Sequence, residues 1–176
     1  MRRVPHRPKA GYRRLLGVLA LAVVPLTACD PDPADITVLT VETSLSSQNR
    51  NLHKVGPADE VVYGWNDLQG TAEVGGQTIG VQLLGNVEYV DGGGPFGGFV
   101  TLTFPDGALL ALRVVDATAI AKTDTSDARF EGLVRVIGGT GRFLEASGRG
   151  VLSGRRNDEL GGVVEMKYVV RVEGVQ

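Results

Sequence analysis

The feature that most constrains this chain is an alternation of apolar and polar residues at every second position, interrupted by short turns rich in glycine. From residue 36 onward this period recurs, and no helical period accompanies it. A period of two is typical of half-buried β-strands. The expected strands are residues 36–45, 60–67, 78–90, 98–104, 108–121, 128–137, 146–155 and 161–173. The turns between them are too short for crossover helices, so we expect neighbouring strands to be antiparallel.

Each predicted strand has one apolar and one polar side. The clearest apolar faces hold Ile79, Val81, Leu83, Val87, Tyr89, Phe130, Val134, Val136, Val164, Met166, Tyr168, Val170 and Val172. Eight such strands can bury these faces by closing into a barrel, whose interior is either filled with side chains or holds one small ligand. The expected fold is therefore an all-β, eight-stranded antiparallel β-barrel with an apolar lumen. A two-sheet sandwich accommodates the pattern less economically.

Several glycines lie inside the predicted strands, some of them on the apolar face. They are Gly85, Gly98, Gly132, Gly148, Gly150 and Gly162. A glycine within a strand marks a sharp bend or leaves room for another group. Closure of a small barrel demands bends, so the sequence leaves both interpretations open.

The N-terminal residues have the pattern of an export signal. Residues 1–14 hold six basic side chains and no acid, and an apolar run of 11 residues follows at 15–25. That run is shorter than the roughly 20 residues of a membrane-spanning helix, so it indicates a secretory signal. It ends in Leu-Thr-Ala-Cys, which resembles the lipobox of bacterial lipoproteins and predicts lipidation of Cys29. The alternative is a buried cysteine near an ordinary cleavage site, and the export route, general or twin-arginine, stays open.

These features predict three segments: a signal peptide at 1–28, a tether at 29–35 and a single barrel domain at 36–176. Aspartate alternates with proline early in the tether, as in a stiff, solvated linker. Its three carboxylates could bind calcium, but the prolines limit their convergence.

Removal of the signal changes the charge balance of the chain. The full sequence has a formal charge of −2, from 18 basic and 20 acidic residues. Residues 1–28 contain six of the basic residues and none of the acids, so the mature chain carries −8. A net acidic protein is a poor partner for nucleic acid or anionic lipid.

Cysteine and histidine are scarce, which excludes several kinds of site. Cys29 is the single cysteine, and His6 and His53 are the two histidines. A disulfide framework, a cysteine zinc site, a histidine metal centre and a Ser-His-Asp triad all need more of these residues. We therefore expect no metal and no cofactor. His53 lies in a predicted surface loop at 46–59.

A glycine-rich segment at residues 138–143, Gly-Gly-Thr-Gly-Arg-Phe, follows a predicted strand as a nucleotide-binding loop would. Leu144 stands where that motif needs its third glycine, no lysine follows for a phosphate-binding loop, and only 35 residues remain after Gly141. The segment therefore does not predict nucleotide binding.

The same segment, followed by Ala-Ser-Gly-Arg-Gly at 146–150, resembles a stretch of the allene oxide cyclase and dirigent barrel superfamily. Its bacterial members include spirotetronate-forming cyclases of polyketide pathways, and the likeness covers about residues 55–173. The resemblance implies an eight-stranded barrel that needs no cofactor, is often oligomeric and acts on flexible hydrophobic molecules. Glycines at 97 and 98, and Gly-Val at 150–151, replace aromatic residues expected there, so no catalytic residue transfers.

Two sets of side chains are candidates for a site in the lumen. Asp116, Glu42 and Tyr89 are the candidate catalytic residues. A carboxylic acid in an apolar barrel would have a raised pKa suited to general acid or base work. A tyrosine could donate a hydrogen bond to a substrate carbonyl. Asp116 has the same parity as apolar neighbours on its strand, but its side chain could also point into solvent at the strand end. For Glu42, the sequence does not decide which face of the strand points inward. The candidate ligand-binding residues are Tyr63, Trp65, Tyr89, Phe104, Phe130, Met166 and Tyr168, with the first two included only if their strand turns its aromatic face inward.

Such an interior can act mainly by shape. The leading hypothesis is an extracytoplasmic, lipid-anchored, cofactor-free cyclase or isomerase of specialised metabolism, for example antibiotic biosynthesis. It would hold a flexible, polyketide-like apolar molecule in a near-reactive conformer. The alternatives are a non-catalytic barrel that binds a hydrophobic ligand and a structural envelope lipoprotein with a filled lumen. A homo-oligomer is compatible with each.

Overall fold

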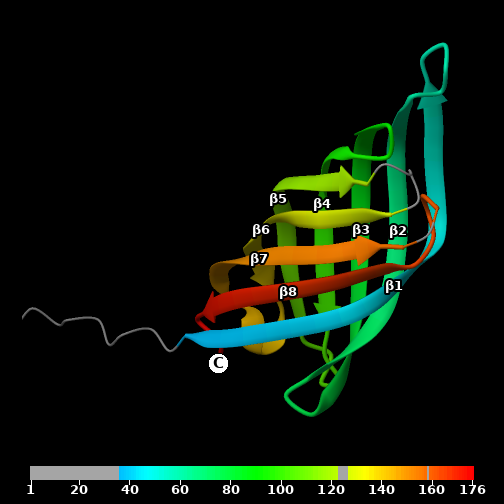
Figure 1. Ribbon diagram of the computed structural model, residues 1–176. Helices are drawn as coiled ribbons and strands as arrows, with labels where there is room; N and C mark the ends of the chain where they lie inside the picture. The colour runs from blue at the N-terminus through cyan, green and yellow to red at the C-terminus, as the bar shows by residue number, and fades with distance from the viewer. Residues whose placement is uncertain (1–35, 123–126, 158) are drawn as a thin grey trace, which may run out of the picture. The chain divides into compact units, whose positions relative to one another are not determined.

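Eight antiparallel strands follow one another around a closed barrel in chain order, and β8 pairs with β1 to complete it (Figure 1). The computed structural model describes residues 36–122, 127–157 and 159–176. The strands are β1 (Thr37–Val55), β2 (Val61–Val74), β3 (Gln77–Val90), β4 (Gly94–Thr103), β5 (Leu109–Ala121), β6 (Ala128–Gly139), β7 (Ser147–Arg156) and β8 (Val164–Glu173). The predicted fold class is confirmed. The predicted signal, Cys29 and the tether lie outside the described residues.

Strand β1 is the longest, and two neighbours share it. Its first half pairs with β8 from Thr37 to Leu45, and its second half pairs with β2 from Ser46 to Val55. A register shift between Ser47 and Asn49 accompanies the change of partner, and Figure 1 shows the strand turning there. The predicted loop at 46–59 is therefore wrong as far as Val55. Its residues are polar because most of them are exposed on both faces of the strand.

The lumen is filled with apolar side chains over most of its length. Every residue named above for the apolar faces lies in the core or packs against it. Each large apolar side chain that is fully buried contributes about 1.5–3 kcal/mol relative to exposure. No helix among the described residues is long and apolar enough to cross a membrane.

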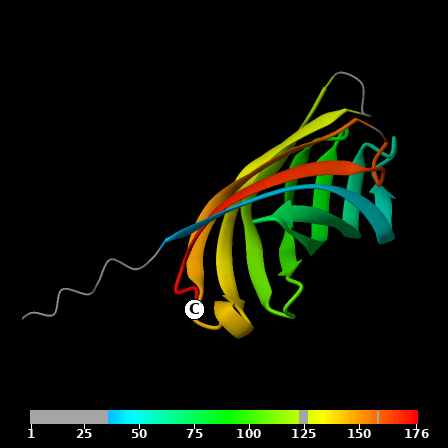
Figure 2. The same cartoon turned by 90° about the horizontal axis from the view of Figure 1, so that it is seen from below.

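One end of the barrel, the closed end, carries the turns β2–β3, β4–β5 and β6–β7. There a short 3₁₀ helix, η1 (Gly141–Phe143), places the buried ring of Phe143 4.9 Å from that of Phe104, centroid to centroid. The guanidinium carbon of Arg142 lies 4.5 and 5.0 Å from the Phe104 and Phe143 centroids, and its Nη1 lies 2.6 Å from Asp106 Oδ2. Figure 2 shows η1 beside the C-terminus. The glycine-rich motif therefore closes this end of the lumen, and η1 with the rings of Phe104 and Phe143 is here called the stopper.

Two of the strand glycines serve different purposes. At Gly148, with φ +150°, a Cβ would lie 2.0 Å from the carbonyl oxygen of Arg171, so the glycine permits a bend with close strand approach. At Gly85, which faces the lumen, the nearest atom to a Cβ would be 3.8 Å away. Gly85 therefore leaves room inside the barrel.

Candidate functional site

A pocket lies in the lumen at the end opposite the stopper, here called the mouth. Its cavity volume is about 60 Å³. Phe96 and Phe130 form part of its wall, with ring centroids 5.6 Å apart in an edge-to-face arrangement. The lining residues are Leu52, Asn66, Leu68, Leu83, Gly85, Val87, Tyr89, Phe96, Phe130, Arg156, Leu160, Gly161, Val164 and Met166. The pocket is thus almost entirely apolar.

Arg156 is the one charged residue among the described residues of this lining, and its side chain faces inward. The residue is 1% exposed at the end of β7, where it shares the parity of the buried Leu152. Burial lowers the pKa of Arg156, and the nearby Tyr89 and Asp127 partly oppose that effect. The neighbouring Arg155 points outward and binds Glu165 instead. The hydropathy pattern does not predict Arg156 as a pocket residue, although its parity with Leu152 is a usable signal.

Tyr89 brings a phenol to the same wall. Burial raises the pKa of Tyr89 to about 12, although the positive charge of Arg156 acts in the opposite direction. The side chain is therefore a neutral hydrogen-bond donor at physiological pH. Asn66 adds an amide, whose Oδ1 accepts a hydrogen bond of 2.6 Å from Ser47 Oγ. Three polar groups thus border one apolar cavity.

Strand β1 holds the rim of the pocket in place. Arg50 Nη1 donates a hydrogen bond of 3.2 Å to the carbonyl oxygen of Leu160, whose side chain packs against the core. Leu160 and Leu52 both line the pocket. The polar extension of β1 therefore has a structural use, because it positions an apolar residue at the mouth.

The structure brings three of the predicted ligand-binding residues together, since Tyr89, Phe130 and Met166 all line the pocket. Phe104 and Tyr168 are buried in the core but do not line it. Burial raises the pKa of Tyr168, and its hydroxyl has no hydrogen-bond partner among the described residues.

The predicted lumen placement of Tyr63 and Trp65 is wrong. Both lie on the outer face of β2, 58% and 43% exposed. The inward positions beside them belong to Gly64 and Asn66, which are buried. Asn66 faces inward because it borders the pocket, and a glycine stands at 64 because a Cβ there would lie 2.0 Å from the carbonyl oxygen of Asn51 on β1.

Neither candidate carboxylate faces the lumen, so the solvent alternative for Asp116 is the correct one. A bulge between Val115 and Thr118 turns Asp116 to solvent, with φ +48°, and brings Ala117 inward. Glu42 is exposed, and its Oε1 lies 2.6 Å from Lys167 Nζ on β8. In the described part of the chain, the buried polar or charged residues are Thr43, Asn66 and Arg156.

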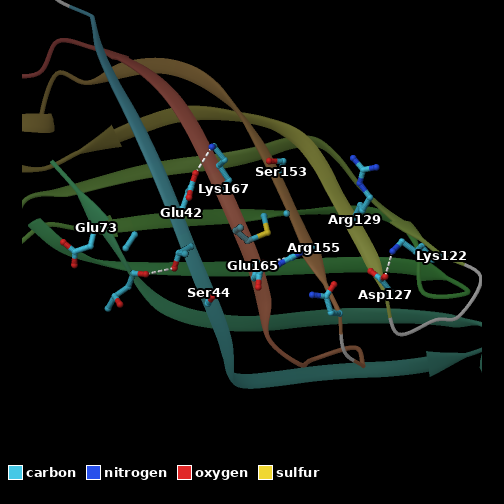
Figure 3. Close-up of a pocket in the computed structure, with 16 residues that line it drawn as sticks. Glu42, Ser44, Glu73, Lys122, Asp127, Arg129, Ser153, Arg155, Glu165 and Lys167 are labelled. Carbon is cyan, nitrogen blue, oxygen red and sulfur yellow. Dashed lines mark hydrogen bonds and ion pairs between the residues drawn. The ribbon is translucent and has the colours of Figure 1, made fainter. Parts of the chain in front are cut away.

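A larger hollow of about 1180 Å³ is lined by residues of β1, β2, β6, β7 and β8, most of them polar or charged, with the buried Thr43, Ala72 and Met166 among them. Most of its charges pair with one another, as Figure 3 shows for Lys167 with Glu42 and for Lys122 with Asp127. Exposed ion pairs of this kind contribute about 0–1 kcal/mol and remain solvated. This hollow is therefore open surface and offers no buried chemistry.

The mouth pocket could bury a slim apolar group and present a guanidinium and a phenol to an oxygen acceptor. Within the ranges that the structure describes, no three His, Cys, Asp or Glu side chains are placed to hold a metal ion. Pockets for drug-sized ligands measure about 300–1,000 Å³. The lumen as it stands therefore fits a group of only a few heavy atoms.

No protein-family model matches this chain, and neither the curated proteins nor the solved structures contain a match to it. The resemblance to the allene oxide cyclase superfamily therefore stays a prediction. We therefore infer the function of the mouth pocket from its geometry alone.

Proposed function

We propose that this protein is an exported, lipid-anchored barrel that binds a slim apolar molecule with a carboxylate or carbonyl group. The observation that carries the proposal is the buried Arg156 in the wall of an apolar pocket. A buried ionisable group with a perturbed pKa in the wall of a pocket is a candidate functional group. The apolar part of the ligand would enter the lumen, and its oxygen would accept hydrogen bonds from Arg156 and Tyr89.

The volume of the pocket favours small acids over polyketide-sized ligands. A cavity of about 60 Å³ holds a short or branched alkyl end, whereas a polyketide-sized molecule needs several times that space. Gly85 widens the pocket where any side chain would narrow it. Short-chain and small branched acids therefore fit better than long-chain or polycyclic molecules.

A cofactor-free cyclase or isomerase is the second candidate. One observation favours it: a neutral phenol and a guanidinium meet at one wall of the pocket. Two such donors could stabilise negative charge that develops on a substrate carbonyl, while the lumen holds the substrate in one conformer. Binding without turnover is better supported, because the lining as far as the structure describes it holds no carboxylate for general acid or base catalysis.

Calorimetric titration with a series of saturated fatty acids and their methyl esters tests the proposal. Arg156→Gln should weaken binding of the acids by about 10- to 100-fold, since a hydrogen bond to a charged group contributes about 1.5–3 kcal/mol. Arg155→Gln is the matched control, because it removes the exposed arginine next along β7. Equal affinity of the acids for both variants would contradict the role of Arg156.

A second pair of variants tests whether the lumen is the binding site. Gly85→Val should abolish binding by filling the pocket, and Gly80→Val should leave it unchanged. Both glycines lie on β3 with space for a Cβ, but Gly80 faces away from the lumen. If no acid, ester or candidate polyketide binds the wild-type chain, the barrel is a structural envelope protein and the proposal fails.

A further inference from the structure

Four arginines form one row across the outer face of the barrel, here called the arginine row. Arg113 on β5 pairs with Arg135 on β6, Arg135 pairs with Arg149 on β7, and Arg149 pairs with Arg171 on β8. All four are exposed. Residues directly opposite in an antiparallel pair have Cα atoms about 4.5–5.5 Å apart, and like charges there are destabilising.

Most of this charge is not neutralised within the fold. In the described ranges, the side chains of Arg135, Arg149 and Arg171 take part in no ion pair or hydrogen bond. Basic residues on the same strands behave differently, since Arg155 binds Glu165 and Lys167 binds Glu42. The row therefore presents uncompensated positive charge to an external anion.

The neighbouring cross-strand row is apolar. Two residues along each strand, Val115, Leu133, Val151 and Val169 pair in the same order. Leu133 and Val151 are about half exposed. The two rows border a shallow groove of about 610 Å³, where Glu173 is the one carboxylate among the lining residues that the structure describes. We call these two rows, with their groove, the arginine face.

The start of the barrel lies at this face. Ile36 lines the groove, and the predicted lipidation site, Cys29, precedes it by seven residues. Seven residues span at most about 25 Å. A lipid on Cys29 would therefore hold the arginine face within that distance of the bilayer surface.

From these positions we propose that the arginine face docks on an anionic phospholipid surface, with arginines at the headgroups and the apolar row at the acyl boundary. The proposal rests on the predicted lipid anchor and not on the ligand of the lumen. The net charge of −8 does not oppose it, since charges farther than about 8 Å are largely screened at physiological ionic strength. The row lies toward the closed end, so docking leaves the mouth free for ligand exchange.

Site-directed fluorescence on the full chain tests this docking. The chain is reconstituted into phosphatidylcholine vesicles with or without phosphatidylglycerol and with a lipid-borne quencher. A fluorophore is placed at Leu133→Cys on the arginine face or at Leu84→Cys on β3. These leucines are 47% and 46% exposed, so they are a matched pair on different sides of the barrel. Labelled wild-type chain measures any contribution from Cys29.

We expect quenching at position 133 to exceed quenching at position 84 several-fold at physiological ionic strength, only with phosphatidylglycerol, and the difference to be lost at high salt. The triple variant Arg135→Gln, Arg149→Gln, Arg171→Gln should remove the difference. The control variant Arg129→Gln, Arg155→Gln, Lys167→Gln removes the same number of charges from β6, β7 and β8 and should retain it.

Three results would overturn the proposal. Equal quenching at the two positions would show that no face is preferred. Quenching at 133 that is independent of phosphatidylglycerol or of the arginine triple would show that charge is not the cause. Protection of the position 133 fluorophore by soluble DNA, without an effect of anionic vesicles, would assign the face to a different partner.

Discussion

The guanidinium of Arg156 and the phenol of Tyr89 both line the apolar mouth of the lumen, and burial shifts the pKa of each. Tyr89 stays a phenol and Arg156 stays a cation at physiological pH, so both groups donate hydrogen bonds and neither accepts one as an anion would. At the scale of single residues, the pocket is therefore suited to ligands that bring an oxygen acceptor.

The raised pKa of Tyr89 predicts a loss of stability in alkali. The unfolded chain releases the phenol proton near its ordinary pKa of 10.0, and the folded chain retains it until about pH 12. The unfolded state therefore binds fewer protons in this window, and stability falls as pH rises through it. Two pKa units correspond to about 3 kcal/mol. Tyr89→Phe should remove that part of the loss, as measured by urea unfolding across the window.

The comparison depends on the slope of stability against pH, because Tyr89→Phe also changes stability at neutral pH. Burial raises the pKa of Tyr168 as well, so a residual alkaline loss is expected in the variant. An unchanged slope in Tyr89→Phe would show that Tyr89 is not shielded from solvent in the way that the lumen geometry requires.

At the scale of elements, the β6–β7 connection closes one end of the lumen independently of the mouth. Phe143→Ala should cost about 3–5 kcal/mol, the usual cost of deleting a buried phenylalanine ring. Arg142→Gln should cost about 1 kcal/mol, because it removes two cation–π contacts and one exposed ion pair. Leu144→Ala is the control, since Leu144 follows directly and is exposed. Urea unfolding measures all three.

The stopper should have no effect on ligand affinity at the mouth. Titration of Arg142→Gln with fatty acids checks this, because this variant loses less stability than Phe143→Ala and should remain folded. A loss of affinity equal to that of Arg156→Gln would show that the two ends of the lumen act as one cavity.

The sequence predicted faces well where alternation is regular. In β3, β6 and β8 every second residue is apolar, and these residues point into the barrel. In β5 the bulge at Val115–Thr118 adds a residue to one strand, so parity counted from Leu112 fails at Asp116. A bulge depends on the pairing of two strands and leaves little mark on hydropathy.

The site itself was harder to predict, because a pocket reverses the usual pattern. Gly64 and Asn66 face inward on β2 while Tyr63 and Trp65 face out, so hydrophobicity alone assigns the wrong side. Arg156 was missed for the same reason, since charged residues are almost never fully buried unless paired. Parity alone, continued from Leu152, would have placed it correctly.

At the scale of the whole molecule, closure makes the strands one cooperative unit. The β1–β8 pairing closes the order of strands into a barrel, and the buried Val41 and Val170 lie on its two sides. A destabilising substitution at the β1–β8 pairing, here called the seam, should therefore also destabilise the strands on the opposite side of the barrel. A single tryptophan, Trp65 on β2, provides a signal from outside the seam.

Val170→Ala should lower stability by about 1–3 kcal/mol through the cavity that it leaves in the core. Because the barrel is closed, tryptophan fluorescence and far-ultraviolet circular dichroism should report one coincident urea transition, shifted equally in the variant. Val169→Ala, the outward neighbour on β8, should shift it much less. If circular dichroism lost amplitude while Trp65 kept its wild-type midpoint, the seam would open before the remaining strands unfold, and closure would not be the source of cooperativity.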